Sequence, residues 1–133
     1  MARRFENLKI FNLSYTFLLN VYSMLKLLPQ EELRNIFSQL QRASTSIVLN
    51  IVEGASNKSN KVFFNHLQYS YGSCKESQVL LMLCKDLKYV DEKLFLKLLN
   101  ELDDLTASIF KFMNSIEKEI NVRNPSFPFY VGN

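Results

Sequence analysis

Apolar residues recur every three or four positions along most of the chain, which is the period of one face of an α-helix. The first such stretch runs from about Arg4 to Leu28 and stops at Pro29, which cannot continue a helix. Further apolar residues outside the stripe give this helix more hydrophobic surface than a two-layer packing needs. The stripe expected to face the core is Phe5, Leu8, Phe11, Tyr15, Leu18, Tyr22 and Leu25, and the apolar residues outside it are Ile10, Phe17, Leu19 and Val21.

The second pattern contains the stretch S-I-V-L-N-I-V-E-G at residues 46–54, which fits either a strand with polar interruptions or a helix with a polar edge. The apolar positions before and within it share one side at 100° per residue, so the helix is the better interpretation. We expect this helix to begin near Gln30 to Leu33 and to end at Gly54. Its core face is Leu33, Ile36, Phe37, Leu40, Ala43, Ser44, Ile47 and Ile51.

Four polar residues are organised along this second helix. Arg42, Ser46 and Glu53 fall on the side opposite the core face, and Asn50 lies between the two sides. If they face another helix or subunit, Ser46, Asn50 and Glu53 would hydrogen-bond across the contact and fix its register. A ligand site is the alternative. Arg42 would contact a polyanion, or pair with Glu53 or with a carboxylate of another helix.

The third helix is expected from about Lys61 to Lys88, after the loop A-S-N-K-S-N-K, with Ser59 or Asn60 as its N-cap. Gly72 in its middle costs about 1 kcal/mol relative to alanine. Close approach of a neighbouring helix would explain this glycine, and local flexibility is the alternative. The core face is Phe63, Leu67, Ser70, Cys74, Gln78 and Leu81.

The fourth helix is expected from an N-cap at Asp91 to about Ile120, and the residues after it have two prolines and no helical period. Four long helices with short loops favour an all-α protein, an antiparallel up-down-up-down four-helix bundle with an extended C-terminal tail. Residues 1–121 would form the bundle and residues 122–133 the tail.

The composition agrees with one helical domain. The chain has 133 residues, of which 47% are hydrophobic and 22% charged, and only 3 are glycine and 3 proline, which argues against a turn-rich β-fold. No apolar run reaches the length of about 18 residues that would span a membrane. Cys74 and Cys84 would lie about 15 Å apart on one helix, too far for a disulfide. Such thiols are typical of a reducing compartment, so we expect a cytoplasmic protein.

The sequence offers no catalytic or metal-binding pattern. It has one histidine, His66, and no Glu-x-x-His pair of the kind that di-iron bundles use. Two cysteines on one helix and a single histidine do not make a zinc site. The two glycine-rich motifs that bind phosphate groups, Gly-x-x-x-x-Gly-Lys and Gly-x-Gly-x-x-Gly, are both missing from the sequence. We therefore expect no enzyme activity, no metal or other cofactor and no small-molecule substrate.

The formal net charge is +3, which permits a polyanionic partner without requiring one. In an up-down-up-down bundle the starts of the first and third helices lie at the same end. Arg3, Arg4, Lys58 and Lys61 would then gather at one pole, beside the free N–H groups of a helix start. They would contact phosphates of a nucleic acid, or be ordinary solvated charges.

Apolar residues outside the core faces point to an interface between subunits, because a soluble monomer rarely exposes large apolar patches. A homo-oligomer is the simplest explanation of this surplus. The residues concerned are Phe17, Leu19, Leu49, Val52, Val79 and Leu83.

Two paired motifs resemble a known family. Q-L-Q-R-A-S-T-S-I-V-L-N-I-V-E-G at 39–54 and K-V-F-F-N-H-L-Q-Y-S-Y-G-S-C-K-E at 61–76 are similar to the small bacterial four-helix-bundle proteins encoded in ribosomal-RNA intervening sequences. The resemblance covers residues 5 to about 120. Gln41 stands where the family commonly has an arginine.

This resemblance implies a four-helix bundle that assembles as a ring-like homopentamer. No enzymatic activity is established for the intervening-sequence branch. A related branch, the accessory variability determinant of diversity-generating retroelements, binds a reverse transcriptase and nucleic acid through a basic surface.

The functional hypothesis is accordingly a non-enzymatic, oligomeric accessory or scaffold protein. It would bind structured RNA, or an RNA–protein assembly, through a basic surface that ring symmetry multiplies. The alternative is a scaffold that binds only protein.

Overall fold

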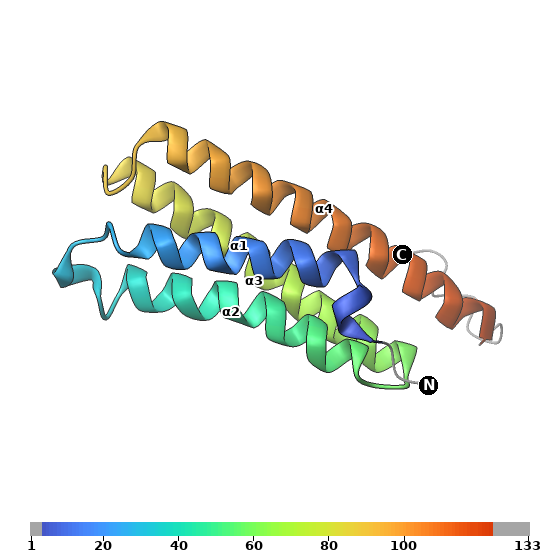
Figure 1. The fold of residues 1–133 in the computed structure, drawn as a ribbon. Coiled ribbons are helices and arrows are strands. Elements are labelled where there is room, and N and C mark those ends of the chain that lie inside the picture. The colour runs from blue at the N-terminus through green and yellow to red at the C-terminus, as the bar shows by residue number, and fades with distance from the viewer. Residues whose placement is uncertain (1–3, 124–133) are drawn as a thin grey trace.

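The computed structural model describes residues 4–123, and within this range the protein is all-helical, with four α-helices and no strand (Figure 1). This confirms the all-helical fold class that the periodicity predicted. The elements in chain order are the short 3-10 helix η1 (Phe5–Asn7), α1 (Lys9–Leu25), the 3-10 helix η2 (Gln30–Glu32), α2 (Ile36–Ala55), α3 (Asn60–Asp86) and α4 (Glu92–Arg123).

The four helices enclose one core. Helices α1 and α3 each pack against both α2 and α4, so every helix has two neighbours. Figure 1 shows the chain turning back between successive helices, with η1 and the turn between α2 and α3 at the same end of the molecule. The buried side chains of all four helices form a single apolar cluster.

Side chains and backbone define the ends of α3 and the start of α4. Ser59 Oγ accepts a hydrogen bond from the backbone N–H of Val62 at 3.3 Å, and Asp91 Oδ1 accepts one from the N–H of Leu94 at 2.8 Å, so both expected N-caps are confirmed. At the other end of α3, Lys88 adopts a φ of 64°. This left-handed residue lets the backbone N–H of Tyr89 reach the carbonyl of Cys84 at 2.9 Å, which closes the helix.

The face of α1 that enters the core differs from the expected stripe. Tyr15 and Tyr22 were expected inside, but they are 47% and 44% exposed, whereas Phe17, expected on the outside, is fully buried. Because α1 is apolar on nearly every side, its periodicity does not single out one face. The buried residues of α1 are Ile10, Ser14, Phe17, Val21, Met24 and Leu25.

The two helical glycines have the opposite roles from those expected. Gly54 was expected to stop α2, yet it is a buried residue inside the helix, which continues to Ala55. A Cβ atom at Gly54 would lie 2.6 Å from Phe63 Cδ1, so its absence allows α2 and α3 to approach closely. Gly72 was expected at a close helix contact, but a Cβ atom there would meet nothing within 4 Å.

Helix α4 continues to Arg123, through the position at which the extended tail was expected to begin. Residues 122 and 123 are therefore helical, and the rest of the expected tail, residues 124–133, lies outside the described residues.

The connections at the far end of the bundle are tied together by one hydrogen bond. The hydroxyl of Tyr89, between α3 and α4, donates to Glu32 Oε2 in η2 at 2.7 Å. This bond holds the pKa of Glu32 below its ordinary value, and the same carboxylate raises the pKa of Tyr89. The bond therefore links the α1–α2 connection to the α3–α4 connection.

Candidate functional site

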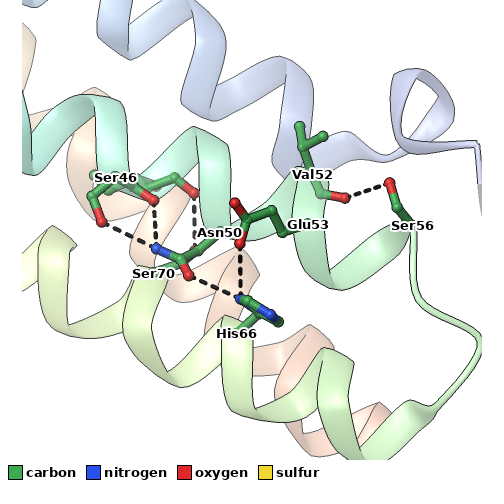
Figure 2. Close-up of polar contacts among 8 residues, drawn as sticks. Ser46, Asn50, Val52, Glu53, Ser56, His66 and Ser70 are labelled. Atoms are coloured by element: carbon green, nitrogen blue, oxygen red, sulfur yellow. Dashed lines mark hydrogen bonds and ion pairs between the residues drawn. The ribbon is translucent and has the colours of Figure 1, made fainter.

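A chain of hydrogen bonds crosses the contact between α2 and α3 (Figure 2). The amide Nδ2 of Asn50 donates to the backbone oxygen of Ser46 at 3.0 Å and to Ser46 Oγ at 3.1 Å. Asn50 Oδ1 lies 3.0 Å from His66 Nδ1 on α3, and Ser73 Oγ of the same helix donates to Ser46 Oγ at 3.1 Å. Two residues of α2 thus bond to two residues of α3.

The geometry of this network assigns the protons of His66. The carbonyl of Ser46 can only accept, so the NH₂ group of Asn50 must face it and Oδ1 must face the imidazole. Oδ1 also only accepts, so Nδ1 of His66 carries a hydrogen. In the neutral ring the lone pair is therefore on Nε2, on the other side of the imidazole.

Glu53 joins the network loosely. Its Oε2 lies 3.8 Å from His66 Nδ1, and its side chain is 67% exposed. An ion pair forms there only when His66 is protonated. Below the network, Ser70 Oγ donates to the carbonyl of Ile47 at 2.9 Å in the buried part of the same helix contact. These bonds fix how α3 is placed along α2.

The spacing of the residues explains why they meet. Ser46, Asn50 and Glu53 are four and three positions apart on α2, and His66 and Ser73 are seven apart on α3, so each set follows one edge of its helix. The hydrogen bonds between these residues hold α3 in one position along α2.

The expected basic pole is present in part. Lys58 and Lys61 are exposed beside the first turn of α3, and neither makes an ion pair with another residue in the range 4–123. Arg4 directly precedes η1, which lies at the same end of the molecule as the turn before α3 (Figure 1), but Arg4 pairs with Glu6 at 3.5 Å. Arg3 lies outside the described residues.

Arg42 is separate from that pole. It lines a shallow, open hollow along α2, and the other three polar residues expected along this helix line the same hollow: Ser46, Asn50 and Glu53. Glu53 is eleven positions further along, about 16 Å of helix rise, and the two do not pair. Within the described part of the chain, Arg42 makes no ion pair.

One cluster was not predicted from the sequence. The outer side of the first turns of α3 is hollowed, and the hollow is lined by Val62, Asn65, His66, Gln68 and Tyr69. The sequence signal was available, because a ring at position 69 lies off the core face of α3 and must point outward or toward a neighbour.

No arrangement typical of a metal centre occurs in the described range. Between residues 4 and 123, no three histidine, cysteine, aspartate or glutamate side chains group closely enough to hold a metal ion. None of the helices in that range is long and apolar enough to cross a membrane.

Comparison with known proteins supports the fold and the resemblance of the motifs. A protein of unknown function from the S23 ribosomal protein family of Bacteroides thetaiotaomicron has a solved structure that superposes with a TM-score of 0.73. It is 21% identical, and the match covers 79% of this chain and 95% of that one, so the likeness shows the fold. No curated protein matches the sequence. The model of the 23S rRNA-intervening sequence protein family matches residues 6–111, which is most of the chain. The chain, with its paired motifs on α2 and α3 and its four-helix fold, therefore belongs to the 23S rRNA-intervening sequence protein family.

Proposed function

We propose that this protein is a non-enzymatic, oligomeric accessory or scaffold protein that binds structured RNA or an RNA–protein assembly. The observation that supports this most is the placement of Lys58 and Lys61, which are exposed and form no ion pair within residues 4–123. They flank the start of α3, where free backbone N–H groups also favour anions. The family's name connects its members with sequences that interrupt 23S rRNA.

The proposed assembly is a ring-like homopentamer of antiparallel up-down-up-down bundles in the cytoplasm. A net charge of +3 per subunit is modest, and a ring would bring several copies of the basic pole together. Several weak phosphate contacts on one RNA would then act as one multivalent interaction.

Salt dependence tests the RNA-binding part of this proposal. Binding of a labelled, structured RNA is expected to weaken steeply as salt rises, because each phosphate contact releases counterions. The double variant Lys58→Ala, Lys61→Ala should bind more weakly. Its slope of log affinity against log salt concentration should be shallower by roughly 0.7–0.9 for each phosphate that is no longer neutralised. The matched control is Lys93→Ala with Lys97→Ala, which removes two exposed lysines from the first turns of α4. Absence of RNA binding at low salt would contradict the proposal.

Oligomerisation is tested separately. Val79 is 62% exposed on α3, and Leu83 and Leu87 follow on the next turns, so these three offer an apolar strip to another subunit. Light scattering should give a multiple of the subunit mass for the natural chain. The double variant Val79→Glu, Leu83→Glu should sediment as a monomer with unchanged helical circular dichroism. A monomeric natural chain would remove the assembly from the proposal.

The second candidate is a scaffold that binds only protein, with its charge serving solubility. The same apolar strip favours it, since exposed apolar residues also suit a protein partner. An oligomer of the natural chain that retains its mass but does not bind RNA would support this alternative.

A further inference from the structure

Tyr69 has an unusual position for an aromatic residue. It is 67% exposed, more than any other aromatic side chain from residue 4 to residue 122, and it makes no hydrogen bond or ring contact within that part of the chain. The flat face of its ring is therefore free to meet another molecule. The other largely exposed aromatic side chains each contact a neighbour: Tyr15 stacks on Phe11, Tyr22 accepts a hydrogen bond from Gln41, and Phe110 packs against Tyr71.

The residue that follows on the same face of α3 has no side chain. Gly72 is three positions after Tyr69, and a Cβ atom there would meet nothing within 4 Å. A glycine in the middle of a helix costs about 1 kcal/mol relative to alanine, and no contact inside this subunit requires it. Its effect is to leave bare helix backbone beside the ring of Tyr69, which gives room for a flat group.

Polar groups of the right kind for a nucleobase lie on the other side of the same ring, in the hollow toward the start of α3. Asn65 and Gln68 line the same hollow as Tyr69, and their amides offer both donors and acceptors. His66 also lines the hollow, and in its neutral form Nε2 is an acceptor because Nδ1 bonds to Asn50. Lys61 is one turn before Asn65 on the outer side of α3.

We propose that an unpaired RNA base stacks on the ring of Tyr69 within this hollow. Its edge faces the amides of Asn65 and Gln68, and its flanking phosphate lies toward Lys61 and Lys58. This inference rests on the proposed function and names the part of the RNA that is recognised. Proteins commonly recognise single-stranded RNA by stacking bases on aromatic side chains, each worth about 1–3 kcal/mol.

The acidic residues near this face set the direction of the RNA backbone. Glu76 is exposed one turn beyond Gly72, and Glu53 lies beside His66 on the α2 side. Both repel phosphate, whereas a neutral base can approach them. The phosphates therefore run from Tyr69 toward the start of α3, where Lys61 and Lys58 outnumber one carboxylate, Glu119, which accepts a hydrogen bond from Asn60 at 2.9 Å.

A helix of a second subunit could also pack against α3 at this place, since glycine allows two helices to approach closely. The surroundings of Tyr69 favour the base. Two amides and the imidazole of His66 line the hollow beside it, and Lys61 is two turns before it, whereas charged residues are depleted in the centre of protein interfaces. The apolar residues of α3 that suit a subunit contact begin at Val79, two turns beyond Gly72.

The test uses the full chain and a short single-stranded RNA that carries 2-aminopurine, whose fluorescence falls when it stacks on an aromatic ring. Tyr69→Leu keeps an apolar side chain but removes the flat ring, and should weaken binding by about 5- to 150-fold. Its slope of affinity against salt should stay unchanged, because the same phosphates are still neutralised. Tyr69→Phe should bind like the natural chain.

The possible outcomes separate a failure of the base site alone from a failure of the proposed RNA-binding function. If the natural chain binds no RNA at low salt, both fail. If it binds RNA and Tyr69→Leu binds equally well, the base site is wrong and the proposed function stands. Equal weakening for a fully paired duplex would also overturn the site, since a duplex offers no unpaired base. A change of oligomeric mass in Tyr69→Leu or Gly72→Gln, with 2-aminopurine fluorescence unaffected, would assign this face to subunit contact instead.

Discussion

Gly54→Ala is expected to lower the free energy of unfolding by about 1–3 kcal/mol, the usual cost of overpacking a core. The added Cβ would lie 2.6 Å from Phe63 Cδ1 and 2.9 Å from His66 Cβ, closer than such atoms can come. The Phe63 ring cannot easily move away, because it is fully buried and packs edge-on against Phe112 of α4. Helices α2 and α3 would have to separate. Urea unfolding followed by circular dichroism measures the change.

Gly72→Ala is the matched control, because it makes the same substitution in a helix where the new methyl group meets nothing. It should raise the free energy of unfolding by up to about 1 kcal/mol through helix propensity. Phe63→Leu in the Gly54→Ala background should recover part of the loss, since the smaller side chain leaves room for the methyl group. If both glycine variants shift stability in the same direction, close packing at Gly54 is not the cause.

Asn50→Leu is expected to cost about 1–3 kcal/mol, although leucine fits the same volume and favours a helix. The amide of Asn50 accepts from His66 and donates to Ser46, so its removal leaves a partly buried ring N–H without its acceptor, while Ser46 Oγ keeps the hydrogen bond from Ser73. The His66 side chain is only 26% exposed, so water can replace the missing acceptor only in part. Thermal unfolding of the single variant measures the cost.

A double-mutant cycle identifies the source of this cost. Replacing both residues, as Asn50→Leu with His66→Leu, should cost less than the sum of the two single changes, because no polar group then lacks its partner. Asn114→Leu on the exposed side of α4 should be close to neutral. Additive effects at positions 50 and 66 would mean that their hydrogen bond contributes no coupling.

The helices could be predicted from the sequence because their apolar residues repeat with the helical period. The core residues of α2 were largely those expected from one clear stripe, apart from Leu33, which precedes the helix and is 50% exposed. Helix α1 was different, because it has apolar residues all round and two possible stripes. Its tyrosines were the useful signal: a buried Tyr15 or Tyr22 would need a partner for its hydroxyl, whereas Phe17 needs none.

The candidate site could be predicted only in part. Periodicity along α2 placed Ser46 opposite the core face and Asn50 between the two sides, whereas both lie at the contact with α3. One helix does not reveal which residues of the next lie opposite. The partners His66 and Ser73 depend on the register of α3 against α2, which many packing interactions decide together. A glycine is ambiguous for the same reason. In the sequence Gly54 suggests a helix stop, and only the position of Phe63 shows that it allows close packing.

The two native cysteines have a practical consequence for labelling. Both Cys74 and Cys84 are buried, and burial raises the pKa of each thiol to about 11. At neutral pH almost none of either side chain is thiolate, the form that reacts with maleimides or iodoacetamide. A cysteine introduced on the surface, for example Lys61→Cys, would therefore be modified selectively without first removing the native pair, and a fluorophore there would report directly on a partner that approaches the start of α3.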